Sequence, residues 1–206
     1  PASIATCAAS LQILEIQDTN LEGPIPPFIG NLTQLQGLHL INNNLLTGEI
    51  PPALGALIRL KTLYLSQNNL TGRIPDALGA LTNLEKLDLS QNNLTGILPI
   101  DLLLNLTELY ILSFSQNNLT GKIQSLDLSM LPNLQLLDAY GNSFDGGLPV
   151  GLAEHQSLIF IDLQKNQLTG SLGHTTSSTS HIIGLSKLRV LSVSNNQLNG
   201  DILAWV

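Results

Sequence analysis

Apolar residues recur along this chain with a short period inside segments and a long period between them. The string L-x-x-L-x-L-x-x-N-x-L-x-G fits eight times, at steps of 24 or 25 residues and a last step of 30. The x-L-x-L part alternates apolar and polar residues, which predicts a short strand with one buried face. The copies begin at Leu11, Leu35, Leu60, Leu84, Leu109, Leu134, Leu158 and Leu188. This regularity predicts a stack of eight similar layers.

Two further columns of the repeat explain how the chain leaves each strand. An Asn amide offers two donors and one acceptor, so it can pair backbone groups that the turn would bury unpaired. This column comprises Asn43, Asn68, Asn92, Asn117, Asn142, Asn166 and Asn196, with Thr19 in the first copy. A glycine column follows it, typical of a backbone conformation or a close approach that a Cβ would hinder.

After the glycine, most copies continue with x-[I/L]-P, as in Gly72-Arg73-Ile74-Pro75. The whole pattern, L-x-G-x-I-P-x-x-L-G-x-L-x-x-L, resembles the plant-type leucine-rich repeats over residues 11–203. It is similar to receptor-kinase ectodomains, receptor-like proteins and polygalacturonase-inhibiting proteins. The resemblance implies an α/β-type repeat solenoid, a right-handed superhelix with a parallel β-sheet on its concave face. It also implies a short second sheet and 3₁₀ or irregular turns on the convex side.

Departures from the pattern mark irregular layers. Copies five, seven and eight lack the proline, having Gln124, Gly173 and Leu203 instead, and we expect the second sheet to weaken toward the C-terminus. His155 occupies a slot that holds leucine elsewhere, and we interpret it as a satisfied core or edge residue rather than a ligand. A Ser/Thr-rich excess at about residues 173–182 predicts a loop inserted in copy seven.

The ends suggest a single solenoid, residues 11–206, whose last repeat is incomplete. Residues 1–10 resemble the remnant of an N-terminal cap, and Cys7 is either a free thiol or half of a disulfide with an upstream partner. A solenoid leaves apolar faces open at both ends. We therefore expect N- and C-terminal caps or neighbouring chains to cover them, especially around Leu198, Ile202 and Trp205.

Composition narrows the function. The net charge of −7, with eight scattered Lys and Arg residues, argues against nucleic acid and favours a basic partner if charge matters. No apolar run approaches the roughly 20 residues that span a bilayer, so this segment predicts no membrane contact. The chain carries no recognisable signal peptide. No catalytic, nucleotide-binding or metal motif is present, so we expect no enzyme activity, cofactor or metal.

The exposed strand positions are the candidate binding residues. Stacking aligns equivalent residues in columns about 5 Å apart. Two patches stand out, Glu15–Tyr64 and Asp138–Gln164. Tyrosines there suit interface anchors, although cross-strand packing explains them equally well. The Asp138–Asp162 pair favours a Lys- or Arg-bearing partner. The predicted partner-binding residues are Glu15, His39, Tyr64, Asp88, Asp138, Tyr140, Asp162 and Gln164.

Five N-x-[ST] sequons favour a secreted, glycosylated protein or the extracellular face of the cell surface. They lie at Asn31, Asn69, Asn93, Asn105 and Asn118. The leading hypothesis is a non-catalytic ectodomain that recognises a protein or peptide on its concave face. It would be a receptor or cell-wall-enzyme inhibitor in defence or signalling. The alternatives are an ice-binding protein, since the Ser/Thr/Asn rows of copies three to five are nearly identical, and a structural subunit of a larger assembly.

Overall fold

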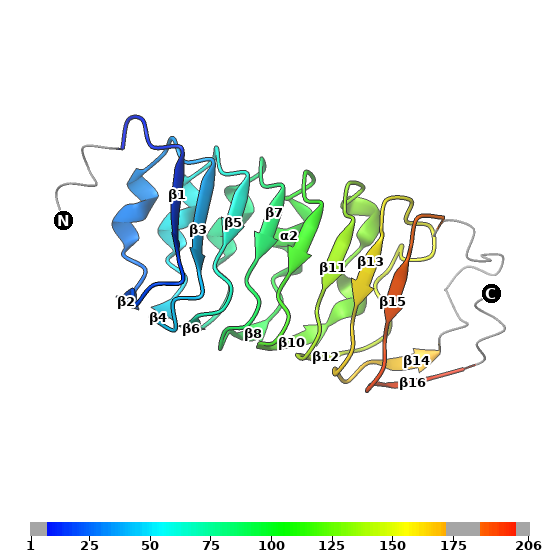
Figure 1. Ribbon diagram of the computed structural model, residues 1–206. Helices are drawn as coiled ribbons and strands as arrows, with labels where there is room; N and C mark the ends of the chain where they lie inside the picture. Colours follow the sequence, from blue (N-terminus) through cyan, green and yellow to red (C-terminus); the bar gives the residue numbers. More distant parts are fainter. Residues whose placement is uncertain (1–7, 172–185, 201–206) are drawn as a thin grey trace.

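The structure is a computed structural model that describes residues 8–171 and 186–200. Figure 1 shows the strands of its large sheet side by side along the length of the molecule. All pairings in this sheet are parallel, which confirms the predicted leucine-rich-repeat architecture. The strands lie in the order β1 (Ile13–Gln17), β3 (Gly37–Ile41), β5 (Thr62–Tyr64), β7 (Lys86–Asp88), β9 (Ile111–Ser113), β11 (Leu136–Asp138), β13 (Phe160–Asp162) and β15 (Val190–Ser192).

The strand leucines align because each layer pairs with the next in strict repeat register. Leu38 pairs with Leu63, Leu63 with Leu87 and Leu87 with Leu112, and all four are buried. Since side chains alternate along a strand, the residues on either side of these leucines face outward from the sheet. The inward leucines form one continuous core from layer to layer.

A second set of short parallel sheets follows the glycine column. It comprises β2 (Glu22–Pro24), β4 (Leu45–Glu49) and β6 (Asn69–Thr71), then β8 (Thr95–Ile97), β10 (Asn118–Lys122) and β12 (Ser143–Asp145), then β14 (Thr169–Ser171) and β16 (Gln197–Asn199). Backbone hydrogen bonds also cross the two breaks, from the Thr95 amide to the Gly72 carbonyl and from the Thr169 amide to the Gly146 carbonyl, both at 2.8 Å.

The expected weakening of this second set toward the C-terminus is wrong. Copy five lacks the proline, yet its strand β10 has five residues and pairs on both sides. Strands β14 and β16, of the other two copies without proline, pair with each other. The reason is positional: the paired residues lie before the proline site, so the proline takes no part in these hydrogen bonds.

Tight turns connect the second sheet back to the first. They are the 3₁₀ turns η1 (Pro27–Asn31), η2 (Pro52–Ala56), η3 (Asp76–Ala80), η4 (Ile123–Ser125) and η5 (Leu128–Met130), and the α-helical turn α2 (Ile100–Leu104). Copy four has one residue more than copy three between the proline and the next repeat, and the wider α-helical turn accommodates it while burying Leu102 and Leu103.

The Asn column forms a continuous hydrogen-bond ladder, as predicted. Asn92 is representative: its side-chain oxygen accepts from the Leu70 amide at 3.0 Å, and its Nδ2 donates to the Leu65 carbonyl at 2.8 Å. Among the described residues no fully buried side-chain N or O lacks a hydrogen-bond partner. The ladder thus joins each layer to the one before it without leaving turn groups unpaired.

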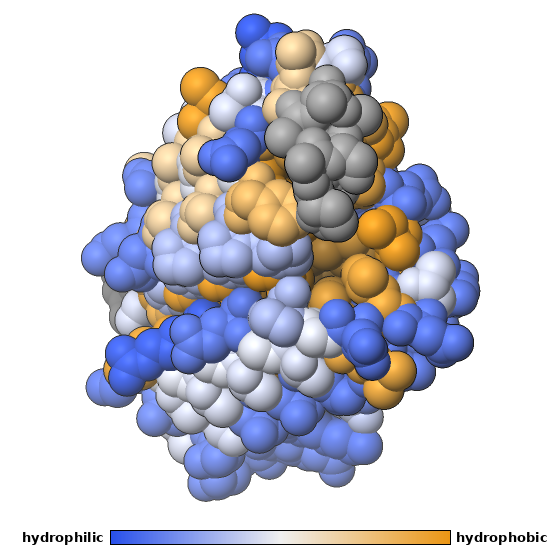
Figure 2. Space-filling view, turned by 90° about the vertical axis from the view of Figure 1, so that its left-hand side faces the viewer, coloured by the Kyte–Doolittle hydropathy of each residue, from blue (hydrophilic) through white to orange (hydrophobic). Residues whose placement is uncertain are grey.

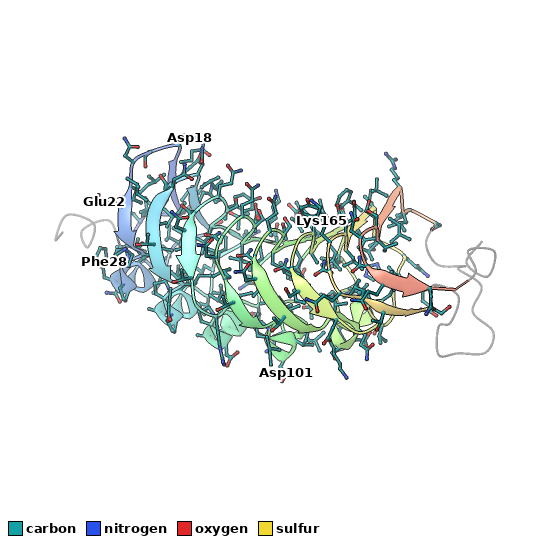
Figure 3. All side chains as sticks on the ribbon, turned by 90° about the horizontal axis from the view of Figure 1, so that it is seen from below. Asp18, Glu22, Phe28, Asp101 and Lys165 are labelled. Carbon is teal, nitrogen blue, oxygen red and sulfur yellow. The ribbon has the colours of Figure 1, made fainter. Side chains whose placement is uncertain are left out.

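The stack is curved. Seen from below in Figure 3, it bends into an arc, with Asp101 of the turn α2 on the outer side and Lys165, which follows β13, on the inner side. The large sheet therefore forms the concave face and the turns form the convex face. Cys7, the insertion at 173–182, Ile202 and Trp205 lie outside the described residues.

Candidate functional site

The central exposed column of the concave face lies where the repeat predicts it. Strand pairing joins Glu15 to His39, His39 to Tyr64 and Tyr64 to Asp88. The column continues through Ser113, Asp138, Asp162 and Ser192. The structure thus brings together Glu15, His39 and Tyr64 in one half and Asp138 and Asp162 in the other. Asp88, between the two groups, accepts a hydrogen bond from the Ser90 amide at 3.0 Å.

In the N-terminal half, His39 links three neighbours. Its Nε2 lies 2.7 Å from the Thr62 hydroxyl, and its Nδ1 lies 3.6 Å from the Glu15 carboxylate. Its ring stacks on Tyr64 with the ring centroids 4.8 Å apart. The Glu15–Tyr64 patch is therefore a connected group of side chains that already contact one another.

Lys86 extends this group. Its ammonium lies 5.3 Å from the centre of the Tyr110 ring, within the range of a cation–π contact. Hydrogen bonding to Tyr110 raises the pKa of Lys86, and Tyr64 acts in the same direction. Immediately before strands β5 and β7, Lys61 pairs with Glu85 at 2.9 Å. For Tyr64, the structure therefore supports the cross-strand packing interpretation.

In the C-terminal half, Asp138 and Asp162 lie side by side on β11 and β13. Asp138 accepts hydrogen bonds from the Tyr140 amide at 3.1 Å and the Ser113 hydroxyl at 3.3 Å. Partial burial raises the pKa of Asp138, hydrogen bonds from Ser115, Tyr140 and Ser113 oppose this, and the Asp162 carboxylate raises it further.

Tyr140 and Gln164 flank the two aspartates. Lys165 places its ammonium 5.2 Å from the centre of the Tyr140 ring, and hydrogen bonding to Tyr140 raises the pKa of Lys165. Gln164 donates to Asp162 at 3.2 Å and accepts from the Ser194 hydroxyl at 2.6 Å. In the described part of the chain, no Lys, Arg or His forms an ion pair with Asp138 or Asp162.

A third exposed column escaped the sequence interpretation. It lies two residues before the central column on each strand, and in the last four layers it is apolar throughout. It contains Ile111, Leu136, Phe160 and Val190, paired in register across β9, β11, β13 and β15. Val190 is 39% exposed and the other three are half-buried. The period-two alternation that identifies the central column would have identified this one too.

His155 is buried and fully satisfied, as predicted. Its Nδ1 accepts from the amides of Ser157 and Leu158, at 3.3 and 3.2 Å, so Nε2 carries the proton and donates to the Leu131 carbonyl at 3.0 Å. In copies with leucine at this slot, as at Leu131, the backbone carbonyl accepts the corresponding amide hydrogen bond. In this layer, Nδ1 of the imidazole therefore takes the place of the backbone carbonyl as the hydrogen-bond acceptor.

All five sequon asparagines are exposed. Asn69 donates to the Asn44 carbonyl at 2.6 Å, and Asn105 follows the turn α2 on the convex side. Exposure is the structural condition for glycosylation. Within residues 8–171 and 186–200, no three His, Cys, Asp or Glu side chains gather in a group suited to a metal ion. The same residues include no helix long and apolar enough to cross a membrane.

Sequence profiles of one repeat family match most of these layers. "Leucine Rich Repeat" matches residues 10–32, 34–57 and 187–206, and "Leucine Rich repeats (2 copies)" matches residues 58–102. The matched segments coincide with layers of the eight-stranded sheet. The chain belongs to the leucine-rich-repeat family.

Plant proteins are among the relatives of this leucine-rich-repeat chain. Receptor-like protein 36 of Arabidopsis thaliana is 41% identical over 76 residues, which make up 37% of this chain and 10% of that protein. The ectodomain of the Arabidopsis receptor kinase HAESA, solved with an N-terminally extended IDA peptide hormone, matches with a TM-score of 0.82 and 31% identity. That match covers 91% of this chain and 30% of that chain.

A plant ice-binding protein matches with a TM-score of 0.78 and 36% identity, over 96% of this chain and 60% of that one. The chain thus spans less than two thirds of each of these three relatives. The relatives confirm the plant-type assignment.

Proposed function

We propose that this chain is a non-catalytic scaffold that binds a protein or peptide partner on its concave face. The observation that supports this proposal most directly is the contrast between the two sides of each strand of the large sheet. Inward positions are apolar in every layer and mostly buried leucine, whereas outward positions differ from layer to layer. A scaffold needs only the inward pattern, so the outward variety is free to specify a partner.

The relatives support this proposal. HAESA was solved with a peptide hormone bound, and Receptor-like protein 36 is named as receptor-like. The exposed sequons support an extracellular location. A role in signalling, in defence or in inhibiting a cell-wall enzyme belongs to this proposal and depends on the partner.

The test is a selection of random peptides, displayed on phage, against the immobilised chain. Selected peptides are then measured against the double variant Tyr64→Ser/Tyr140→Ser, which removes two aromatic rings from the concave face. Phe28→Ser/Met130→Ser is the matched control, because it removes two exposed apolar side chains from the convex turns. We expect the concave variant alone to lose binding. Equal binding to both variants, or loss only in the convex variant, would overturn the proposal.

Ice binding is a second candidate function, favoured by a polar array on the second sheets. Thr47 pairs with Asn69, and Thr95 with Asn118, and all four side chains are exposed. The ice-binding relative covers nearly the whole chain. Sugars on Asn69 and Asn118 would interrupt the array. Thermal hysteresis and ice-recrystallisation inhibition are measured on the glycosylated and the deglycosylated protein, and activity in neither form dismisses this candidate.

The structural-subunit alternative concerns the terminal layers. Leu14 and Ile16 of β1, and Leu191 of β15, are only half-buried, whereas their counterparts in the middle layers are fully buried. Figure 2 looks onto the N-terminal end and shows apolar side chains open to view beside the residues drawn in grey. We propose that caps or neighbouring chains cover these ends. Light scattering tests the subunit alternative, because a monomer at all concentrations contradicts it.

A further inference from the structure

The C-terminal half of the concave face combines two parallel columns of opposite character. The first is the apolar stripe, defined as Ile111, Leu136, Phe160 and Val190. The second is the acidic pair, defined as Asp138 and Asp162. On strands β11 and β13, each residue of the stripe lies two positions before an aspartate on the same outward face. Strand geometry puts the columns about 7 Å apart and the layers about 4.8 Å apart.

This combination is confined to one half of the sheet. In the first four layers the stripe position holds Ile13, Gly37, Thr62 and Lys86, which form no apolar run. The pairing register makes the stripe continuous, because Leu136 lies between Ile111 and Phe160, and Phe160 lies beside Val190. Within the described residues the stripe is therefore a continuous, partly exposed apolar surface of four adjacent layers.

The acidic pair indicates that the partner is positively charged. No basic side chain among the described residues pairs with either carboxylate, and Lys165, which follows β13, contacts Tyr140 instead. Two carboxylates on paired strands, whose backbones lie about 4.8 Å apart, match a guanidinium, whose planar fork presents five donors. The chain's net charge of −7 also attracts a basic partner over longer distances.

We propose that this surface binds an extended peptide segment in which arginine alternates with apolar residues. Alternate side chains of an extended peptide point to opposite sides. A peptide that crosses the strands between the two columns therefore places arginine toward Asp138 and Asp162 on one side. On its other side it places apolar groups toward Leu136 and Phe160. The inference rests on the proposed concave-face binding function and adds to it the chemistry of the partner and the half of the sheet it occupies.

The probe is a dye-labelled hexapeptide of alternating Arg and Leu with both ends capped, followed by fluorescence anisotropy. Peptides of alternating Arg–Ser and Glu–Leu are the controls. We expect the Arg–Leu peptide to bind most tightly, and its affinity to fall as salt rises from about 0.05 M to about 0.5 M, because salt screens charges. Equal binding of the Arg–Ser peptide would overturn the contribution of the apolar stripe.

Two protein variants test the columns separately. Asp138→Asn/Asp162→Asn should weaken binding by on the order of tenfold and flatten its salt dependence, since charge-assisted hydrogen bonds are lost. The control Asp76→Asn/Asp101→Asn changes the net charge equally on the convex side, where both residues are exposed, and should bind as the wild type does. Leu136→Thr/Phe160→Thr should also weaken binding, whereas Ile13→Thr, at the same strand position in β1, should not. Thermal melting by circular dichroism verifies that each variant is folded.

The outcomes separate this inference from the function on which it rests. Wild-type affinity in Asp138→Asn/Asp162→Asn, or an equal loss in the convex control, overturns the inference. If phage-selected peptides lack arginine yet lose binding in Tyr64→Ser/Tyr140→Ser, concave-face binding stands and the inference fails. If the selected peptides bind Tyr64→Ser/Tyr140→Ser and Asp138→Asn/Asp162→Asn as tightly as they bind the wild type, both proposals fail.

Discussion

The stacking of the convex turns provides a sharp test of how the layers fit together. Gly55 lies in the turn η2, and an added Cβ would sit 2.3 Å from the Ala77 carbonyl oxygen of the next turn and 2.9 Å from its carbon. These are backbone atoms of a packed turn and cannot rotate away. Gly30 meets the Ala53 carbonyl oxygen at the same 2.3 Å, so the constraint repeats from layer to layer. We therefore expect Gly55→Ala to force neighbouring turns apart.

The magnitude follows from two opposing effects. Overpacking a well-packed region costs about 1–3 kcal/mol. Replacing glycine by alanine also removes freedom from the unfolded chain, which stabilises by about 0.4–1 kcal/mol. The net expectation for Gly55→Ala is a loss of up to about 2.6 kcal/mol in the free energy of unfolding.

Gly79→Ala is the matched control, at the equivalent position of the next turn, η3. Its added Cβ would meet Leu102 Cα and Asn105 Nδ2 at 3.4 Å, because the next layer carries the wider turn α2. With no severe overlap, this variant should be neutral or stabilised by up to about 1 kcal/mol. Urea unfolding followed by circular dichroism measures both. Equal changes in the two variants would show that the close approach of the turns does not explain the glycine at position 55.

Three further predictions concern the ladder, the acidic pair and the sequons. Asn92→Ala should lower the free energy of unfolding by about 2–4 kcal/mol, because it leaves buried backbone groups unpaired. Asn196→Ala should lower it less, because that layer is partly solvated. Equal losses of the two variants in urea unfolding would contradict this reasoning. The raised pKa of Asp138 means that the folded state binds its proton more tightly than the unfolded state, so this group's contribution to stability falls as pH rises from the ordinary Asp range through the folded pKa. Asp138→Asn should thus raise the melting temperature at neutral pH, with a gain that shrinks on acidification, and a pH-independent difference refutes this cause. Glycosidase treatment of protein from a eukaryotic host should lower its intact mass, and an unchanged mass would show that the sequons are unused.

The repeat pattern predicts the layered fold in detail because every layer solves the same packing problem. A leucine at a given repeat position always faces its equivalent in the next layer, so the pairing of Leu63 with Leu87 follows from their shared place in the repeat. The same argument assigns Asn92 and its equivalents to the buried ladder. Periodicity therefore determines strands, register and core together.

Local backbone conformation is less accessible from the pattern. The residue before each Asn-column position has a left-handed backbone, with φ of 58° at Gln67 and 51° at Lys165, and a glycine only at Gly141. Glutamine and lysine do not signal positive φ; the tertiary ladder imposes it. The turn α2 is similar, because one extra residue could have formed a bulge as easily as a helical turn.

The sequence predicts the positions of the candidate binding residues on the sheet but not the side chains that they contact. Their columns follow from the repeat, yet the partners of Tyr64 and Tyr140 depend on how far long side chains reach across layers. Lys86 and Lys165 contact aromatic rings from positions that the pattern treats as ordinary surface. The apolar stripe carries no unusual residue type, because Ile, Leu, Phe and Val are ordinary strand residues, and only their alignment across paired strands distinguishes them.

These contacts give the two patches unequal capacity for binding. In the N-terminal patch, Glu15 lies near His39, His39 contacts Thr62 and Tyr64, and Lys86 contacts Tyr110, so a partner must replace interactions that already exist. The Asp138–Asp162 pair has hydrogen bonds but no cation among the described residues, and its mutual repulsion amounts to about 1 kcal/mol in water-like surroundings. A cationic partner relieves that repulsion without breaking an ion pair. Most of the binding free energy should therefore come from the C-terminal half. Asp138, whose raised pKa shows that its charged form is disfavoured in the free protein, is the residue that we expect to bind the cationic partner.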